Sequence, residues 1–415
     1  MLHVLSRPVL YALELTFACN HRCVGCPNVL PASSSGKEKQ RTALPQPLGL
    51  AQWRIILEKL APHAQRLKLT GGEPTLYPEF PAFVEYIDTL GIEFVVFTNG
   101  RWPQPTVVLD TLARAQNLVG ILVSLHGACE QSHAAFVGVP GSFKETVKSI
   151  QRAVARGILV TISTVLTCHN LEELNAIVEL AEQLGAHHVV FNRYLGPTIE
   201  GITPSPGELA QAVRDIEALR HQGHAVKFGN CIPQCFIPNE SSGCWAAVAY
   251  CAVDPWGNVR PCTHSPLLAG NLLREPLEKI WFSPAMETFR NAISPACHTC
   301  KAFATCHGGC KALAMEEGLP IDPLANPANA KTIPAPTLLP LHPELHPFQR
   351  FQVREETWGL VLLRGNRIFP VRKEAAPVLA MLDGHSSLAD IQTNFGAAAL
   401  SLVGTLYERG LISLQ

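Results

Sequence analysis

Three cysteines near the start of the chain are spaced so that one loop could hold a metal centre. They form the segment Cys19-x3-Cys23-x2-Cys26, directly after a strand-like run at 11–16. Three thiolates on a tight loop can bind three irons of a cubane 4Fe–4S cluster and leave the fourth iron open. A zinc site would need a fourth ligand, and His21 lies inside the loop, where it is poorly placed. The spacing therefore favours an open iron–sulfur cluster.

Nine further cysteines lie between residues 231 and 310. They read Cys231-x3-Cys235-x8-Cys244-x6-Cys251-x5-Gly257-x4-Cys262 and, after a gap, Cys297-x2-Cys300-x5-Cys306-x3-Cys310. A secreted disulfide scaffold is normally shorter and has a signal peptide, so these clustered thiols indicate metal binding. A pair of zinc knuckles is the alternative, but it would not explain the first triad. Cys129 and Cys168 stand alone and are expected to be core thiols.

Charge and hydropathy restrict the partners and the compartment. The net charge is −1 over 415 residues, which gives no bulk attraction to nucleic acid or to an anionic membrane. The sequence has no run of 18 apolar residues, so no transmembrane helix is predicted. The first apolar stretch is short and lacks a cleavage-site pattern, unlike a signal peptide. We therefore expect a cytoplasmic protein with no nucleic-acid or membrane partner.

Strand-like and helical patterns alternate from about residue 10 to 200. This alternation predicts an α/β fold with a parallel sheet, and about six units suit a partial (βα)6 TIM-type barrel. The predicted domains are a barrel, a small cysteine-rich iron–sulfur domain, a Pro-rich linker and a separate C-terminal module, at 1–225, 226–318, 319–347 and 348–415.

The C-terminal module is predicted to be a winged-helix-like α+β domain. Its strand-like runs are 351–355, 358–363 and 367–371, and its helical patterns are 375–382, 387–394 and 398–408. Winged helices often bind DNA, but this one has little basic excess. Peptide or protein binding is therefore favoured.

With a second motif included, the chain resembles the radical S-adenosylmethionine (SAM) superfamily. Thr70-Gly71-Gly72-Glu73-Pro74 matches the family's GGEP motif, which contacts the SAM amino group. The resemblance implies that the open iron binds SAM and that cluster reduction releases a 5′-deoxyadenosyl radical. It makes Cys19, Cys23 and Cys26 the catalytic centre. It also implies cofactor contacts from residues at or after strand ends, namely Asn99, Ser124, Thr164, Asn170 and Arg193. Many family members have an aromatic residue before the third cysteine, where this chain has Gly25.

The second cysteine block resembles the SPASM extension of radical SAM enzymes, which usually carries two auxiliary 4Fe–4S clusters. By the family's pattern the first auxiliary cluster would be held by Cys244, Cys251, Cys262 and Cys310, and the second by Cys297, Cys300 and Cys306. The pattern ends with one more cysteine downstream, and the sequence has none after Cys310. The fourth ligand stays open: Cys231, Cys235, Asp322 or His307 could serve, or the position could be free for substrate.

The last module resembles the PqqD-like peptide chaperone of pyrroloquinoline quinone biosynthesis, in its patterning and at Trp358 and the Asp383-Gly384 turn. In that family a leader peptide adds as a strand beside the third strand, here near 367–371, with a groove wall from 398–408. Main-chain pairing supplies affinity and side-chain pockets supply specificity. The alternative is a structural cap or a dimerisation domain.

Together these resemblances imply a radical SAM/SPASM maturase of a ribosomally synthesised precursor peptide. Its partners would be the precursor's leader and an electron donor such as flavodoxin or ferredoxin. Crosslinking, thioether formation, epimerisation and backbone excision all begin with the same hydrogen abstraction, and the sequence does not choose among them. The competing hypotheses are an anaerobic sulfatase-type maturase and a non-catalytic metal-binding scaffold for peptides or DNA.

Overall fold

A computed structural model describes residues 2–26, 45–237, 243–329 and 342–415. The chain divides into two compact units, one formed by Arg7–Lys331 with the first two residues and one formed by Thr332–Gln415 with His3–Ser6. The described part of the chain contains no helix that is long and apolar enough to cross a bilayer.

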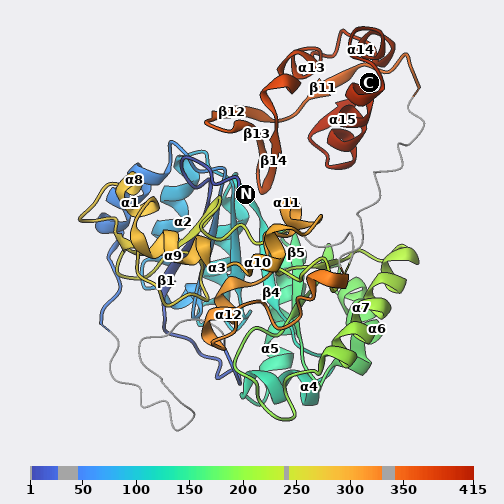
Figure 1. The fold of residues 1–415 in the computed structure, drawn as a ribbon. Coiled ribbons are helices and arrows are strands. Elements are labelled where there is room, and N and C mark those ends of the chain that lie inside the picture. The colour runs from blue at the N-terminus through green and yellow to red at the C-terminus, as the bar shows by residue number, and fades with distance from the viewer. Residues whose placement is uncertain (1, 27–44, 238–242, 330–341) are drawn as a thin grey trace. The chain divides into compact units, whose positions relative to one another are not determined.

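The first unit is built on a ten-stranded sheet with the order β10-β9-β8-β1-β2-β3-β4-β5-β6-β7 (Figure 1). Seven strands run parallel in chain order: β1 (Leu10–Thr16), β2 (Arg66–Gly71), β3 (Phe94–Thr98), β4 (Leu118–Ser124), β5 (Val160–Leu166), β6 (His188–Arg193) and β7 (Val226–Phe228). Because their carboxyl ends meet at one edge of the sheet, the loops after them can build a common site.

The crossover helices are amphipathic and bury their apolar faces. They are α1 (Leu50–Leu60), α2 (Phe80–Thr89), α3 (Pro105–Arg114), α4 (Glu130–Val137), α5 (Ser142–Val154), α6 (Leu174–Gln183) and α7 (Pro206–His221), with 3-10 turns η1 (Pro74–Leu76) and η2 (Leu171–Glu173). In α5, Ile150 and Ala153 are fully buried while the opposite face carries charged residues. The predicted strand–helix alternation and the parallel, barrel-like sheet are confirmed.

The cysteine-rich segment extends this sheet. β8 (Tyr250–Val253) pairs in parallel with β1, and β9 (Asn258–Arg260) and β10 (Gly270–Asn271) continue antiparallel. Short helices follow: α8 (Leu277–Trp281), α9 (Pro284–Asn291), α10 (Pro295–His298), α11 (Phe303–Cys306) and α12 (Lys311–Glu316), then η3 (Pro327–Asn329). The segment therefore belongs to the same compact unit as the barrel.

The second unit contains the predicted three strands and three helices. β12 (Gln352–Glu356), β13 (Gly359–Arg364) and β14 (Arg367–Val371) form an antiparallel sheet, and η4 (Lys373–Ala375), α13 (Ala376–Ala380), α14 (Leu388–Phe395) and α15 (Ala397–Glu408) follow. A second small sheet of β11 (Pro347–Gln349) and β15 (Ile412–Leu414) was missed by the sequence analysis. Leu362, Ile391, Val403 and Leu406 are among the fully buried residues of its core.

The first residues of the chain pack on this second unit. The His3 ring stacks on Trp358 with centroids 4.5 Å apart, and Trp358 Nε1 donates to the Val4 carbonyl at 3.0 Å. The buried Glu356 carboxylate accepts from the Ser6 backbone N–H at 2.9 Å and from its hydroxyl at 3.3 Å. The tetrapeptide His3–Ser6 is thus a structural part of the C-terminal module.

Candidate active site

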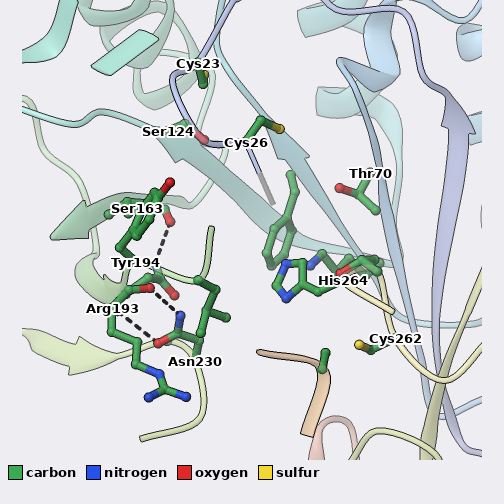
Figure 2. Close-up of a pocket in the computed structure, with 18 of the residues that line it drawn as sticks. Cys23, Cys26, Thr70, Ser124, Ser163, Arg193, Tyr194, Asn230, Cys262 and His264 are labelled. Atoms are coloured by element: carbon green, nitrogen blue, oxygen red, sulfur yellow. Dashed lines mark hydrogen bonds between the residues drawn. The ribbon is translucent and has the colours of Figure 1, made fainter. Parts of the chain in front are cut away.

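The carboxyl ends of the barrel strands surround a cavity of about 530 Å³. Its wall includes the first cysteine triad, ends of β2 to β6, the segment after β7 and part of the second cysteine block. Figure 2 shows Cys26 and Cys262 on different walls of this cavity, with Thr70 and Ser124 nearby. Residues more than 200 positions apart therefore face one chamber.

The loop that carries the first triad is fixed from two sides. On one side, the Asn20 side chain donates to the Arg101 carbonyl at 2.6 Å, and the Arg101 guanidinium donates to the Asn20 carbonyl at 2.7 Å. On the other, the N–H groups of Arg22 and Val24 donate to carbonyls at the end of α4. Three thiols are thereby presented from one short, well-supported loop.

Cys19 is the most constrained thiol of the triad. Burial raises its pKa to about 11, although N–H groups approach the sulfur. These donors are the His21 backbone N–H at 3.4 Å and Asn99 Nδ2 at 3.7 Å. Hydrogen bonds to sulfur favour the thiolate, the form that binds metal. Burial makes the Cys19 thiolate unfavourable, and binding to a positively charged iron would offset this cost.

Glu73 joins the loops after β2 and β3. Its fully buried carboxylate accepts from the Thr98 hydroxyl at 2.8 Å, from the Thr75 hydroxyl at 2.7 Å and from the Asn99 N–H at 2.7 Å. Burial raises the pKa of Glu73, while these hydrogen bonds act in the opposite direction. The side chain is thus turned into the protein, where it positions Asn99, and Asn99 in turn reaches Cys19.

The two glycines of the same motif allow close backbone approach. A Cβ on Gly71, at φ +137°, would lie 2.2 Å from the Thr16 carbonyl oxygen, and one on Gly72 would lie 2.3 Å from the Ala18 carbonyl oxygen. The Gly72 N–H donates to Thr16 O at 2.7 Å, and the Glu73 N–H donates to Ala18 O at 2.8 Å. Glycine at 71 and 72 therefore sets the distance between this turn and the cysteine loop.

The other predicted cofactor contacts lie at strand ends, and whether each faces the cavity depends on which face of its strand it occupies. Ser124 at the end of β4 lines the cavity, as does Asn99. On β5 the residues facing the cavity are Ser163 and Val165, whereas Thr164 points the other way and donates to the Leu125 carbonyl at 2.6 Å. Successive strand residues face opposite sides, so the predicted Thr164 lies one position away from the residues that face the cavity. Ser163, which the sequence analysis did not name, is among those that face it.

Asn170 is not brought to the cavity wall. Its amide donates to the carbonyls of His126 and Val165 at 2.9 and 2.8 Å, and its oxygen accepts from the Thr167 N–H. Because it is fully buried with both ends of the amide engaged, it supports the loops after β4 and β5. His126 is also held structurally: its Nδ1 accepts from the Val165 N–H at 3.1 Å, and burial lowers its pKa well below the usual value.

Arg193 lines the cavity but is paired with a residue of the cysteine block. Its guanidinium makes a two-pronged ion pair with the buried Asp322 carboxylate, and one N–O distance is 2.9 Å. Asp322 also accepts from the Cys310 N–H at 2.6 Å. Burial lowers the pKa of Arg193, but the hydrogen bonds and charge of Asp322 raise it by more. Arg193 therefore fixes the Cys310 backbone as well as facing the chamber.

A second cation on the cavity wall has no such partner. Lys68 Nζ lies 3.9 Å from the centroid of the Phe97 ring, and in the described structure it forms no ion pair within 4 Å. Burial lowers its pKa from the usual 10.5 to about 8. The nearby carboxylate of Glu14 is instead paired with Arg260, whose guanidinium also donates to the Thr263 and Ser265 carbonyls. That pair fixes the turn after Cys262.

Comparison with known proteins gives this geometry its family. Residues 13–181 match the radical SAM superfamily, and residues 244–306 match the SPASM iron–sulfur cluster-binding domain. The mycofactocin maturase of Mycobacterium ulcerans is 31% identical over 338 residues, which cover 77% of this chain and 87% of that protein. The chain belongs to the radical SAM superfamily.

Two other similarities bear on this radical SAM enzyme. The AdoMet-dependent heme synthase of Methanosarcina barkeri is 28% identical over 342 residues, covering 76% of this chain and 94% of that protein. The crystal structure of Streptococcus suis SuiB bound to its precursor peptide SuiA superposes with a TM-score of 0.64 at 17% identity, covering 77% of this chain and 76% of that one. The SuiB likeness supports the fold.

As a radical SAM enzyme the chain uses 4Fe–4S chemistry and SAM, and its residues fit both groups. Three thiols on the Cys19–Cys26 loop can hold three irons and leave the fourth for the cofactor. The cavity next to them offers hydroxyl and amide groups from Ser124, Ser163 and Asn99. Within the described residues no three His, Cys, Asp or Glu side chains converge on a single-ion site.

Tyr194 stands where this radical SAM chain departs from the family's pattern. Gly25 has φ +69°, and a Cβ there would lie 1.7 Å from the Tyr194 hydroxyl oxygen. A Cβ on Gly196 would lie 2.4 Å from the same oxygen, and the hydroxyl donates to the Pro197 carbonyl at 3.0 Å. An aromatic ring from the end of β6 therefore occupies the space beside residue 25, and Tyr194 lines the cavity.

The second cysteine block separates into two groups and one remaining thiol. Cys231, Cys244, Cys262 and Cys310 all line the cavity. Elsewhere in the block, burial raises the pKa values of Cys235 and Cys297, and the neighbouring Cys300 and Cys306 contribute to both shifts. Cys251, predicted as a ligand with Cys244, Cys262 and Cys310, is fully buried and is not brought to that wall. Asp322 and His307, predicted as possible fourth ligands, are hydrogen-bonded to other groups.

Proposed function

We propose that the chain is a radical SAM maturase that modifies a ribosomally synthesised precursor peptide. The observation that carries this proposal is the joining, in one chain, of a cysteine-lined barrel cavity to a small module with a free sheet edge. In the described residues β14 pairs only with β13, so one side of it is open to another strand. The relative from Mycobacterium ulcerans is named a maturase, which supports a maturation function.

Cys19, Cys23 and Cys26 would hold the catalytic cluster, and the cavity would bind SAM and the target residue. When bound, the cluster and SAM supply a 5′-deoxyadenosyl radical that abstracts hydrogen from the peptide. The chain's own contribution is to orient the bound ligands and to exclude water. Glu73 fixes Asn99 beside Cys19, while Ser124 and Ser163 offer hydroxyls to the ligand. Apolar walls such as Phe97 and Phe136 keep solvent from a reactive primary carbon radical.

The C-terminal module would recognise the leader. A peptide strand added beside β14 would gain main-chain hydrogen bonds, and the half-buried Phe369 and α15 would supply side-chain contacts. Holding the leader on the same chain raises the effective concentration of the segment to be modified. The winged-helix-like, PqqD-like character of this module is part of the proposal.

The proposal includes a partner that supplies electrons, of the flavodoxin or ferredoxin type, and a cytoplasmic location. Reduced thiols are needed for cluster assembly, and the cytoplasm keeps thiols reduced. All fourteen cysteines are free thiols in the structure, which agrees with that environment.

The experiment is to reconstitute the full chain anaerobically and to supply SAM, dithionite and a candidate precursor peptide, sought among short reading frames near its gene. Formation of 5′-deoxyadenosine together with a mass change in the peptide supports the proposal, and the mass difference identifies the bond that is made or broken. Formation of 5′-deoxyadenosine without any peptide change would overturn the substrate assignment.

Three alternatives are separated by the same preparation. A tetrapyrrole substrate, suggested by the name of the heme synthase relative, would be consumed while the peptide stays unchanged. A sulfatase-type maturase would oxidise a cysteine or serine of a protein instead. A non-catalytic metal scaffold would yield no dithionite-dependent 5′-deoxyadenosine at all.

A further inference from the structure

The cysteine count leaves one thiol without a role. An open 4Fe–4S cluster uses three thiolates and a closed one uses four, so one open and two closed clusters need eleven. The two cysteine blocks contain twelve. The structure distinguishes the thiols by which wall they face and by which neighbours they touch.

Four thiols of the second cysteine block line the same cavity. Cys231 follows β7, Cys244 precedes β8, Cys262 follows β9, and Cys310 precedes α12. A side-chain hydrogen bond links Cys231 to Cys244. Cys244 and Cys310 both lie near enough to Cys262 to interact with it electrostatically. Four thiols from four segments can therefore each bind one iron of a single 4Fe–4S cluster.

Cys251 lies on the opposite face of β8. Its neighbour Tyr250 lines the cavity, and adjacent strand residues point to opposite faces. The Cys251 side chain is fully buried from solvent and does not line the cavity. The charged group that acts on it is Arg290 of α9. Arg290 is held there by hydrogen bonds to the carbonyls of Ala247 and Trp281. Strand geometry thus removes Cys251 from the ligand set.

The remaining four thiols gather around Cys235. Cys297 and Cys300 lie on one turn, where the Cys300 N–H donates to the Cys297 carbonyl at 3.0 Å. The Phe303 N–H donates to the Cys300 carbonyl at 3.1 Å, so this turn leads directly into the helix that carries Cys306. The segment carrying Cys235 is tied to the helix carrying Cys306: the Gln234 N–H donates to Cys306 Sγ at 3.5 Å, and the Thr305 hydroxyl donates to Gln234 Oε1 at 2.9 Å. The Cys235 sulfur also accepts from the Asn326 N–H at 3.2 Å.

We propose that Cys235 replaces the missing downstream cysteine and closes the second auxiliary cluster with Cys297, Cys300 and Cys306. Cys231 closes the first with Cys244, Cys262 and Cys310, and Cys251 is not a ligand. Both auxiliary clusters then have thiolate on every iron. They can carry electrons but have no vacant iron to bind the peptide, so the cluster at Cys19, Cys23 and Cys26 alone binds an exchangeable ligand.

This assignment rests on the family's iron–sulfur chemistry and not on the identity of the substrate. Its test therefore measures iron, not product. The variants are Cys235→Ser and Cys231→Ser, with Cys251→Ser as the matched control, because all three remove one thiol from the same block. Each is reconstituted anaerobically as the full chain, and iron, sulfide and Mössbauer spectra are recorded.

We expect about twelve irons per chain in the wild type and in Cys251→Ser, given three four-iron clusters. Cys235→Ser and Cys231→Ser should each lose up to about four irons or show a three-iron EPR signal. Full cluster content in Cys235→Ser, or loss of a cluster in Cys251→Ser, would overturn the assignment.

A measurement on the unaltered enzyme covers the case in which a variant fails to fold. Mild oxidation with ferricyanide removes the iron that lacks a thiolate. EPR integration should then give about one three-iron cluster per chain, from the catalytic site alone. Two or more three-iron clusters per chain would mean that an auxiliary cluster is open, and the proposal would fail whatever the enzyme's activity.

Discussion

At the scale of single residues, the candidate site depends on side chains that never face the cavity. Glu73 is the main case, since its carboxylate accepts from Thr98, Thr75 and Asn99 and so connects the GGEP turn to the loop after β3. Asn99 then reaches the Cys19 sulfur. In the GGEP motif, the hydrogen bonds of Glu73 therefore matter as much to the site as the two glycines.

Replacing Glu73 by Gln should disturb this connection. The glutamine offers one acceptor and a donor where the carboxylate offers two acceptors, so a buried N–H or O–H is left unpaired. We expect SAM affinity to fall by roughly 10- to 100-fold, as for other positioning residues around metal centres. Titration of SAM into the reconstituted enzyme measures this, and the exposed Glu58→Gln is the control. Unchanged affinity in Glu73→Gln would contradict the positioning role.

Lys68 leads to a prediction about pH. In the cluster-free chain the folded state releases the Lys68 proton near pH 8, whereas the unfolded chain keeps it to about 10.5. Unfolding therefore takes up a proton between these values, and this group makes the folded state more stable as pH rises. Lys68→Met should gain about 1–3 kcal/mol relative to wild type at pH 7, with the difference shrinking towards pH 10. Urea unfolding of both proteins across pH 7–10 tests this, and a difference independent of pH would contradict it.

Sequence reasoning at this scale was strongest where spacing alone carries chemistry. The Cys19, Cys23 and Cys26 loop and the GGEP turn are contiguous, so the chain itself brings their residues together. The structure places Thr164 and Cys251 away from the cavity wall for one physical reason. Each lies on a strand, and the face of a strand residue depends on register, which sequence spacing does not give. Arg193 could not be linked to Asp322 because 129 positions separate them.

At the scale of elements, the turn between β2 and η1 leaves no room for a side chain. Gly71 has its missing Cβ position 2.2 Å from backbone oxygen, so an added methyl group would have to push β1 and β2 apart. Gly91, just after α2, also has a positive φ, of +67°, but no atom lies within 4 Å of the position that its Cβ would take. Comparing alanine substitutions at Gly71 and Gly91 therefore separates the cost of a steric clash from the cost of a positive φ alone.

Gly71→Ala should therefore destabilise the chain far more than Gly91→Ala. Backbone strain alone costs about 1–2 kcal/mol in the second variant. The clash adds to this in the first, for a total of about 3 kcal/mol or more, together with loss of the first cluster. Thermal unfolding and iron content of the two purified variants provide the comparison. Equal destabilisation would show that the approach of β2 to the cysteine loop is not critical.

Most elements followed from periodicity because apolar spacing and burial have the same cause. The strands β2 to β6 and the helices α1, α2, α5 and α6 all lie within the region of about residues 10–200 where strand-like and helical patterns alternate in the sequence. The strands that were not predicted are short: β8 has four residues, β7, β9, β11 and β15 have three each, and β10 has two. A run that short shows no period, and its pairing is decided by distant partners such as β6 for β7.

At the scale of the whole molecule, the proposed function requires the C-terminal module to take up a leader strand. β14 and β12 are the two edges of the same three-stranded sheet, so they serve as test and control within one domain. An added strand protects the amides of the edge that it joins.

Binding of the leader of the candidate precursor peptide should slow hydrogen–deuterium exchange over Arg367–Val371. Exchange over Gln352–Glu356 should stay as it is in the free enzyme. Protection at β12 instead, or at neither edge, would contradict leader binding beside β14. A leader with scrambled sequence distinguishes specific pairing from general attraction.

Because His3–Ser6 packs against Trp358 and Glu356, the module that ends the chain borrows a piece from its beginning. Expressing residues 342–415 by themselves would expose an indole face and leave a buried carboxylate short of two donors. A leader-binding assay on such a fragment would measure a damaged domain unless a peptide with the first six residues were added back.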